Sequence, residues 1–363
     1  MTTSMAASPR TDLQRILIVR LSSMGDVIHA LPAAVMLREA FPQATIGWVI
    51  EERWSELLCA LSTPRSGARS TQRPLVDVIH AVSLKQWRSS ILSNQTWERI
   101  AAGLSDLRSL RYQVAVDLQG AARSAILARW SGAPVVSGAT QPRENLASMW
   151  YSRKVITKRR HVVEQYAELA EAVIGHSLPI PNAILPCDPI AEEVVEQRLR
   201  AAGIQDFTIL NPGAGWGAKQ WPAQRYGEVA EALSHHGIRP ILNYGPREEN
   251  LAQTAEAASG GAARTMSFSV GELVALMRRA RLFIGGDTGP MHLAAALHIP
   301  VVALFGPTDP ARNGPFRTTS IVLRNPNSAN TLTHRMQPDK GLLAISTDEV
   351  VASAMQLLES PRG

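Results

Sequence analysis

The sequence predicts an α/β protein made of two doubly wound, Rossmann-like domains. Short apolar, β-branched runs alternate with stretches of helical periodicity along the chain, a pattern typical of parallel sheets with helices on both faces. The 363 residues suffice for about two domains, and a hydrophobic content of 45% supplies two cores. Because such sheets bind ligands at the carboxyl ends of their strands, polar residues just past strand ends are the first functional candidates.

The first domain is expected over residues 14–178, after a leader at 1–13 that has no apolar core of signal-peptide length and is expected to be disordered. Its strands are predicted at 16–19, 45–50, 76–82, 114–118 and 135–136, and its helices at 27–40, 97–110, 121–130 and 161–174. Pro32 falls in the second turn of the first helix, which is therefore expected to start late or to bend. The loop at 62–74 carries three arginines and no packing residue, so we expect it to be mobile.

Four prolines and the absence of periodicity identify residues 179–189 as the linker between the domains. The second domain is expected over 190–345. Its strands are predicted at 207–211, 239–243, 281–284 and 300–304, and its helices at 190–202, 223–236, 247–258, 270–280 and 290–297. A final helix within 346–363 could cross back onto the first domain.

The charge and cysteine content limit the classes of function. A net charge of +6 suits an anionic partner such as nucleic acid, an acidic membrane surface or a phosphorylated substrate. The cations concentrate at Arg65–Arg73 and Arg153–Arg160 instead of alternating with aromatics along one face, so no nucleic-acid partner is expected. Cys59 and Cys187 have no metal-binding or CxxC spacing, which indicates a reducing, cytosolic compartment. No run of about 18 apolar residues predicts a transmembrane segment.

The first candidate site is the loop after the first strand, which ends in Ser-Ser-Met-Gly-Asp at Asp26. Asp26 fits a helix N-cap. It also fits a general base, because the helix dipole keeps a carboxylate at this position ionised. Gly25 allows a tight turn with room for a ligand, whereas His29 is interpreted as a packing or capping residue. Other polar residues just past strand ends could line the same edge: Glu51, Lys85, Gln119 and Arg143.

A second strand–loop–helix contains Asp287, Thr288 and Gly289. A Gly/Thr loop at a helix start presents N–H groups to an anion such as a phosphate, and Pro290 suits the first helical turn. An ordinary turn with an Asp cap is the alternative. The loop at 305–310 follows the next strand and opens at the same sheet edge, which favours anion binding. We expect the Asp287 loop and the Asp26 loop to face each other across a cleft, with the nucleotide bound by the Asp287 loop and the base supplied by the Asp26 loop.

Two further segments of the second domain are candidates. Lys219 lies in a Gly-rich loop that has neither Walker nor GxGxxG spacing, and it is either a diphosphate contact or a solvated lysine. Glu248 and Glu249 follow the strand at 239–243 and are either ribose ligands or a helix-terminal acidic turn. No metal-ligand spacing such as HExxH occurs, so no metal site is expected.

Four segments, in this order, resemble glycosyltransferase family 9, the ADP-heptose:lipopolysaccharide heptosyltransferases. They are RLSSMGDVIHALP from Arg20, KQWP from Lys219, GDTGPMHLAAAL from Gly286 and FGPTDP from Phe305. The resemblance covers nearly the whole chain. Ser22–Asp26, Arg143–Ser148 and Gly306–Pro310 look most like the heptosyltransferase I branch, which adds the first heptose to the Kdo region of the lipopolysaccharide inner core.

The resemblance implies a GT-B fold, with the acceptor on the first domain and the nucleotide sugar on the second. It implies inversion by single displacement, with Asp26 as the catalytic general base. The implied donor-binding residues are Lys219 at the phosphates, Glu248 at the ribose, Met266 beside the adenine, and Asp287, Thr288, Gly289 and His292 in the nucleotide-sugar loop. The implied acceptor-binding residues are Ser23, Gly25, Lys85, Arg88 and Arg143.

The implied reaction transfers L-glycero-D-manno-heptose from ADP-heptose to a Kdo residue of Kdo–lipid A, without a cofactor or a metal. The enzyme is expected to be a cytoplasmic monomer at the inner-membrane surface, with the two cationic clusters as docking elements or as solvated charges. The alternatives are a later inner-core acceptor, another sugar nucleotide, or a non-catalytic sugar-nucleotide sensor. Two departures from the branch pattern bear on them. Ala214–Trp216 replaces loop hydroxyls before Lys219, and only Lys85 and Arg88 flank Trp87.

Overall fold

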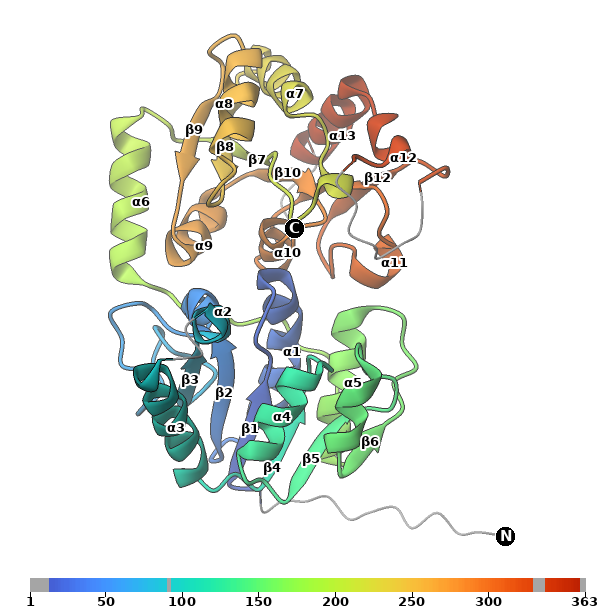
Figure 1. Cartoon of the computed structure of the whole chain (residues 1–363). Coiled ribbons are helices and arrows are strands. Elements are labelled where there is room, and N and C mark those ends of the chain that lie inside the picture. Colours follow the sequence, from blue (N-terminus) through green and yellow to red (C-terminus); the bar gives the residue numbers. More distant parts are fainter. Residues whose placement is uncertain (1–12, 90–92, 329–336, 360–363) are drawn as a thin grey trace. The chain divides into compact units, whose positions relative to one another are not determined.

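The computed structural model describes residues 13–89, 93–328 and 337–359. The side chains of Lys85, Arg88 and Ser89 also lie outside this description. The chain divides into two compact units, Met1–Cys187 and Asp188–Gly363, and the division falls inside the segment interpreted as a linker. Each unit contains a six-stranded parallel sheet with helices packed on it, which confirms the predicted doubly wound α/β class (Figure 1).

The sheet of the first unit has the order β3-β2-β1-β4-β5-β6. Its strands are β1 (Arg15–Val19), β2 (Thr45–Glu51), β3 (Val78–Val82), β4 (Val114–Asp117), β5 (Val135–Ala139) and β6 (Arg153–Val155). Its helices are α1 (Met24–Ala40), α2 (Leu84–Ser89), α3 (Asn94–Ser109), α4 (Ala122–Trp130) and α5 (Val162–Ile174), with the 3-10 helices η1 (Glu52–Leu57) and η2 (Asn145–Trp150). The strand order reverses between β1 and β4, so the loops after these strands flank the position where doubly wound sheets bind ligands.

One face of this sheet carries the core that α3, α4 and η2 cover. The buried residues of this core are contributed by strands and helices alike: Leu17, Val19, Val49, Ala115, Val136, Leu107, Ala125, Leu127, Ala147 and Tyr151. Helices α1 and α5 pack against each other, and α5 also contacts β5 and β6. Because helices cover the sheet, β1 is an uninterrupted apolar run whose residues from Ile16 to Val19 are fully buried.

Helix α1 begins at Met24 and continues through Pro32 to Ala40, so the expected late start is wrong. Ser23 caps the helix, and nearly every residue up to Leu37 is buried. Packing against α5 stabilises this helix beyond what its local sequence favours, because burial of a helix face outweighs the hydrogen bond that a proline loses.

The loop at 62–74 contains a buried residue of its own, Arg73, so the expectation that it has no packing residue is wrong. Arg73 is only 2% exposed, and its guanidinium donates to the carbonyls of Pro64 and Ala68. The Ile79 amide donates to the Arg65 carbonyl at 2.8 Å. A buried arginine that satisfies the carbonyls of a loop fixes its path much as an apolar side chain would.

The second unit repeats the topology of the first, with the order β12-β11-β10-β7-β8-β9. Its strands are β7 (Phe207–Asn211), β8 (Arg239–Tyr244), β9 (Arg264–Ser267), β10 (Leu282–Gly286), β11 (Val301–Phe305) and β12 (Ser320–Arg324). Its helices are α6 (Pro189–Ala201), α7 (Ala223–His235), α8 (Glu249–Ala258), α9 (Val270–Arg279), α10 (Gly289–Ala296), α11 (Pro310–Asn313), α12 (Lys340–Leu343) and α13 (Thr347–Glu359), with the 3-10 helix η3 (Gly217–Lys219). Here the strand order reverses between β7 and β10.

Helix α13 belongs to the second unit, which corrects the idea that it could cross back onto the first domain. Val350, Ala354 and Leu357 join the second hydrophobic core together with Leu233 of α7 and Leu282 of β10. The helix also contacts β11 and β12. Its apolar residues at i, i+4 and i+7 therefore complete the cover of this sheet.

The sequence patterns missed the strands β6, β9 and β12, each of which is an edge strand of its sheet. An edge strand is often short and polar because one side of it meets solvent, as in β6 (Arg-Lys-Val) and β9 (Arg-Thr-Met-Ser), whereas β12 (Ser-Ile-Val-Leu-Arg) is apolar in its middle but not buried. None of the three has the longer, fully buried apolar run by which the central strands were predicted.

Candidate active site

Asp26 is the third residue of α1, and Ser23 is the N-cap, so the N-cap interpretation of Asp26 is corrected. The Ser23 amide and hydroxyl both donate to Asp26 Oδ2 at 3.0 Å. The carboxylate thus reaches back to the residue before the helix, as in a capping box. The loop after β1 and the first turn of α1 therefore fix the Asp26 side chain together.

A buried arginine holds Asp26 from the sheet side. Arg20 Nη2 lies 2.7 Å from Asp26 Oδ2, and the arginine side chain is only 3% exposed. Arg20 Nη1 donates to the carbonyl of Leu118, just past β4, at 2.9 Å. The guanidinium also lies 5.4 Å from the ring centroid of Tyr166 on α5. The sequence reasoning did not select Arg20, although a charge directly after a wholly apolar strand is a signal for a buried, partnered residue.

The Asp26 carboxylate is ionised. Burial by itself would raise the pKa of Asp26, but the Arg20 charge and the two Ser23 hydrogen bonds outweigh it and lower the pKa. The side chain nevertheless keeps 31% of its surface exposed, so a substrate can reach it. The arrangement provides an accessible carboxylate that can accept a proton, although its basicity is modest.

The loops after β4 and β5 meet beside Asp26. Gly120 has a positive φ of 68°, and a Cβ at this position would lie 3.0 Å from the Arg143 amide. The Glu144 amide donates to the Gly120 carbonyl at 2.9 Å. This packing brings the charge of Arg143 close enough to lower the pKa of Asp26 further. Gln119 Oε1 accepts from the Leu21 amide at 2.8 Å, while its buried Nε2 finds no partner among the described residues.

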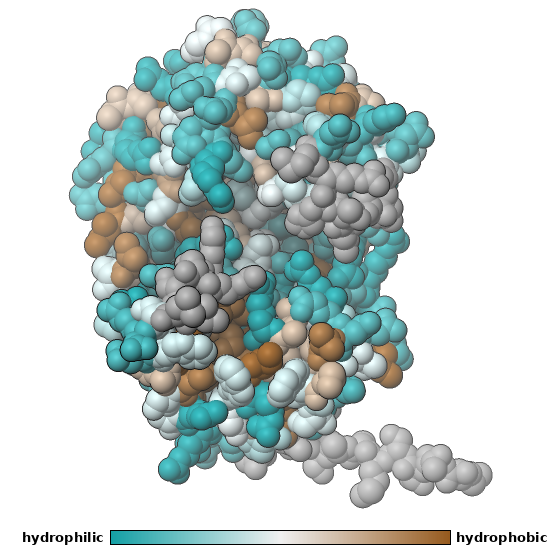
Figure 2. Space-filling view, viewed as in Figure 1, coloured by the Kyte–Doolittle hydropathy of each residue, from teal (hydrophilic) through white to brown (hydrophobic). Residues whose placement is uncertain are grey.

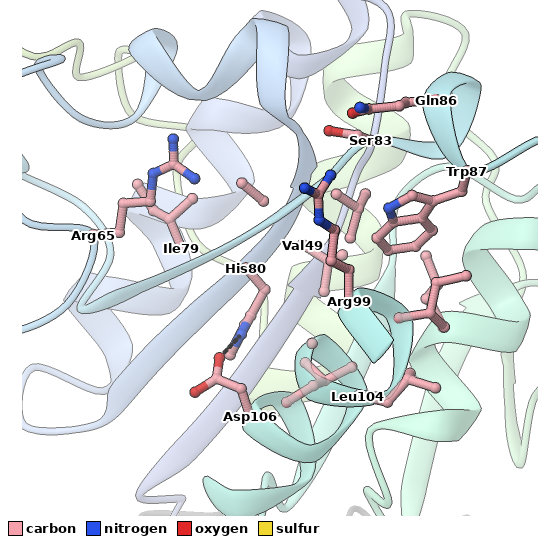
Figure 3. Close-up of a pocket in the computed structure, with 16 residues that line it drawn as sticks. Val49, Arg65, Ile79, His80, Ser83, Gln86, Trp87, Arg99, Leu104 and Asp106 are labelled. Atoms are coloured by element: carbon pink, nitrogen blue, oxygen red, sulfur yellow. Dashed lines mark hydrogen bonds and ion pairs between the residues drawn. The ribbon is translucent and has the colours of Figure 1, made fainter. Parts of the chain in front are cut away.

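A pocket of about 360 Å³ lies at the end of β3, beside α2 and α3 (Figure 3). Ser83, Gln86 and Trp87 line one end of it, and Leu104 and other apolar side chains line its wall. Lys85 and Arg88 belong to α2, but their side chains lie outside the described part of the chain. The guanidinium of Arg99, which the sequence reasoning missed, points into the space between these groups.

Arg99 is a cation without an ion pair among the described residues, and α3 brings it to the ligand-binding edge of the sheet. His80, at the opposite end of the pocket, is held by Asp106 Oδ2 at 2.9 Å and by the Tyr112 hydroxyl at 2.8 Å. Burial lowers the pKa of His80, although the Asp106 charge opposes this effect. Arg99 therefore supplies positive charge at this pocket, and His80 is a neutral, fully partnered side chain.

In the second unit, Asp287 lies between a lysine and a histidine. Lys219 Nζ is 2.6 Å from Asp287 Oδ2, and His292 Nε2 is 3.1 Å from Asp287 Oδ1. Burial would raise the pKa of Asp287, but the His292 hydrogen bond and the Lys219 charge lower it strongly. Because both carboxylate oxygens are occupied, Asp287 fixes its two neighbours and is poorly placed to accept a proton.

The loop Asp287–Gly289 leads from β10 into α10, with Thr288 as N-cap and Gly289 as the first helical residue. A helix start leaves backbone N–H groups without intrahelical acceptors, which suits an anion. Lys219 comes from the facing loop after β7 and lies 5.3 Å from the ring centroid of Trp216. The loop that lacks hydroxyl residues thus provides an indole beside the lysine.

Glu248, and not the neighbouring Glu249, faces the ends of β7 and β8. Its Oε2 accepts from the Gly245 amide at 2.9 Å, and a Cβ on Gly213 would lie 2.0 Å from the same oxygen. Glu248 is half-buried, whereas Glu249 is exposed. Burial raises the pKa of Glu248, and the charge of Glu249 adds to the effect. Met266 lies on β9, paired in register with Asn243 of β8.

Each unit thus places a polar cluster at the reversal point of its sheet: an accessible carboxylate in the first, and a lysine, a Gly-rich loop and a helix start in the second. Two such Rossmann-like units in one chain are the architecture of the GT-B class. Within this class, the chain belongs to glycosyltransferase family 9 (heptosyltransferase), whose family model matches residues 101–342.

Curated relatives and solved structures agree with this assignment. Lipopolysaccharide heptosyltransferase 1 of Pseudomonas aeruginosa is 29% identical over 85% of this chain and 83% of that protein. Its counterpart in Escherichia coli strain K12 is 29% identical over 86% of this chain and 94% of that protein. The structure of E. coli heptosyltransferase WaaC with ADP has a TM-score of 0.76 at 26% identity and covers 95% of this chain and 100% of that chain. E. coli ADP-heptose lps heptosyltransferase II has a TM-score of 0.74 at 21% identity, covers 95% of this chain and 98% of that chain, and supports the fold alone.

Proposed function

We propose that this enzyme transfers L-glycero-D-manno-heptose from ADP-heptose to a Kdo residue of the lipopolysaccharide inner core. The observation that carries the proposal is the accessible Asp26 carboxylate, which Arg20 and Ser23 keep ionised at the reversal point of the first sheet. The names of the relatives support the choice of substrates, since two of them are lipopolysaccharide heptosyltransferase 1. A similar solved structure, with a TM-score of 0.73 and 26% identity, contains ADP-2-deoxy-2-fluoro heptose.

In the proposed mechanism, Asp26 takes the proton of the acceptor hydroxyl as its oxygen attacks the anomeric carbon of the donor. The bond from that carbon to the diphosphate oxygen breaks, its electron pair stays on ADP, and the configuration inverts. A base with a lowered pKa suits this step, because the hydroxyl becomes strongly acidic once its oxygen begins to bond. General-base assistance of this kind is worth roughly 10²- to 10⁴-fold in rate.

The second unit is proposed to bind the donor. Lys219 and the amides near Thr288 and Gly289 would stabilise the negative charge that develops on ADP, so no metal is required in this mechanism. Asp287 would orient Lys219 and His292 without changing its own protonation. Glu248 would accept hydrogen bonds from ribose hydroxyls, and Met266 would lie beside the adenine.

The first unit is proposed to bind the acceptor. Ser23 and Gly25 would surround the reacting hydroxyl. The carboxylate of Kdo would meet a set of cations: Arg143 near Asp26, Lys85 and Arg88 on α2, and Arg99 on α3. Only Lys85 and Arg88 flank Trp87 after β3, which is fewer cations than the family branch has there. Arg99 would add a further positive charge at this place.

The enzyme is proposed to act as a cytoplasmic monomer that associates peripherally with the inner membrane, where a lipid-linked acceptor would be available. Among the described residues, no helix combines the length and apolar character needed to cross a bilayer. The Arg65–Arg73 cluster is a poor docking element, because Arg73 is buried and Arg65 forms an ion pair with Glu52.

The decisive experiment is mass spectrometry of the product formed from ADP-heptose and a truncated Kdo–lipid A acceptor. We expect the acceptor to gain one heptosyl residue. A parallel donor screen with ADP- and UDP-hexoses, and an acceptor that already carries the first heptose, tests the two alternatives. Turnover with a UDP-sugar but not with ADP-heptose would refute ADP-heptose as the donor. Turnover only with the acceptor that already carries a heptose would refute Kdo as the acceptor.

A further inference from the structure

Exposed apolar side chains form a ridge on η2. Leu146 and Met149 are 65% and 77% exposed. In a 3-10 helix, residues i and i+3 lie above one another, so these two side chains share its outward face. Ala147 and Trp150 form the other i, i+3 pair. Ala147 is fully buried, whereas Trp150 at the end of η2 is 39% exposed, so the side of η2 that carries Ala147 faces the core and the Leu146–Met149 ridge faces solvent.

The segment after η2 exposes every second residue. Ser152, Lys154, Ile156, Lys158 and Arg160 are exposed, and the residues between them are half-buried. Arg153 donates to the Ala172 carbonyl of α5 at 2.9 Å, and Arg159 donates to Glu171 on the same helix at 3.4 Å. Because side chains alternate along an extended chain, the odd-numbered residues point towards α5 and the even-numbered residues point away from it.

The even-numbered side chains share the side of the sheet that η2 covers. Lys154 pairs in register with Gly138 of β5. On this side, a Cβ on Gly138 would lie 2.4 Å from the Tyr151 ring. Tyr151, which directly follows η2, and Ala147 within η2 belong to the same hydrophobic core. We call the resulting surface the η2 face, which consists of Leu146, Met149, Lys154, Ile156 and Lys158.

The η2 face lies in a strongly cationic segment. Residues 141–160 contain six arginines and lysines and a single acid, Glu144. Glu144 Oε2 accepts from the Ala122 amide, and neither Lys154 nor Lys158 forms a side-chain ion pair with another described residue. Helix α4 contacts η2, and Figure 2 shows brown apolar residues beside teal polar ones where Figure 1 draws this helix.

This combination fits a lipid surface better than a protein partner. Lysines are depleted at protein–protein interfaces. At an anionic bilayer they are attracted to headgroups, while large apolar side chains enter the boundary of the acyl region. Exposed Leu146, Met149 and Ile156 beside unpaired Lys154 and Lys158 supply both contributions.

We infer that the η2 face docks the first unit on an anionic lipid bilayer. Arg143, proposed to bind the acceptor, lies in the loop that leads directly into η2. Docking would therefore hold the acceptor-binding loop at headgroup level. This functional meaning rests on the proposed function, whereas bilayer binding itself does not depend on which sugar is transferred.

Vesicle flotation of the full chain tests the inference, with phosphatidylcholine vesicles that contain or lack phosphatidylglycerol. We expect binding to the anionic vesicles only, with release by salt. The double variant Leu146→Ser/Met149→Ser should bind about tenfold more weakly or worse, because each side chain loses apolar area that the bilayer would cover. Lys154→Glu/Lys158→Glu should lose about fivefold for each charge removed. A wild-type chain that does not float, or variants that float like wild type, would overturn the inference.

Matched substitutions in the second unit provide the controls. Ile190 on α6 is 59% exposed, and Arg239 at the start of β8 is also exposed. Ile190→Ser and Arg239→Glu should leave flotation unchanged, and equal losses in these variants would refute a specific docking face. All η2-face variants should keep wild-type transfer to a water-soluble, acyl-free acceptor. The two proposals can fail separately. If flotation behaves as expected but neither wild type nor any variant transfers heptose, the proposed function is refuted and the docking face is supported.

Discussion

The guanidinium of Arg20 and the carboxylate of Asp26 form an ion pair of 2.7 Å between the end of β1 and the first turn of α1. The arginine is buried and also binds the Leu118 carbonyl, so it cannot follow a mobile carboxylate. Asp26 is thereby fixed in its ionised state at the edge of the sheet. Its role and its pH dependence are both open to test.

Replacing Asp26 with asparagine should reduce turnover by roughly 10²- to 10⁴-fold, because the amide cannot accept the acceptor proton. ADP binding should stay at the wild-type level, since all the proposed donor-binding residues belong to the second unit. Calorimetric titration with ADP and a transfer assay separate the two effects. Substantial remaining turnover would exclude Asp26 as the base.

Replacing Arg20 with methionine should move the acidic limb of the kcat/KM profile to higher pH. Arg20 lowers the pKa of Asp26, and the base works only when unprotonated, so activity is lost as pH falls through that pKa. Without the guanidinium the pKa rises and the loss begins at a higher pH. Arg20→Lys, which retains the charge, is the control and should shift the limb less. An unchanged profile in the methionine variant would refute this role.

The same interaction links pH to stability. The pKa of Asp26 is lower in the folded chain, so its stabilisation is present above the unfolded-state pKa of about 3.9. It is lost as pH falls through the lower folded-state value. In Arg20→Met, the fall in unfolding free energy on acidification should therefore be smaller than in wild type, as chemical denaturation at a series of pH values would measure.

Lys219→Ala should weaken ADP binding by about 10- to 100-fold, the range expected for a lost hydrogen bond to a charged group. Lys219→Arg should retain part of the affinity, because it keeps the charge with a different shape. Arg239→Ala removes a cation from the far end of the same sheet and should have no effect. Equal affinities for wild type and Lys219→Ala would remove the lysine from the phosphate site.

Asp287→Asn should lower the unfolding free energy by about 3–5 kcal/mol, because it removes the buried carboxylate from a lysine whose side chain is only 15% exposed. The double variant Asp287→Asn/Lys219→Met should recover part of this loss, since the unpaired charge is then gone. Denaturant unfolding of the full chain measures both. Additive losses in the double variant would show that the two side chains do not stabilise each other.

Glu248→Gln should raise the KM for the donor, whereas Glu249→Gln should leave it near wild type. Gly213→Ala should mimic the first variant, because a Cβ there would lie 2.0 Å from Glu248 Oε2 and displace the carboxylate. Steady-state kinetics at saturating acceptor compare the three. A larger effect for Glu249 would reverse the assignment.

Much of the fold could be predicted from the sequence, because the central strands are buried on both faces and therefore appear as apolar runs. The edge strands β6 and β9 have mostly polar sequences, and the apolar run of β12 is only three residues long, so all three were missed. The loops around Asp26 and Asp287 were found because they follow central strands. Arg99 was missed because it lies within a helix, far from any strand end in the sequence.

The sequence by itself determined the doubly wound class, the two-unit organisation and the loops that carry Asp26, Lys219 and Asp287. Periodicity and motif order can be read directly from the sequence, because they depend only on residues that are close together along the chain. Only the tertiary structure decided which charges are paired: Arg20 with Asp26, and Lys219 with Asp287. It also decided which hydrophobic residues remain exposed, including those of the η2 face. Pairing and exposure depend on contacts between segments distant in sequence, because burial and electrostatic energy are set by what surrounds a side chain.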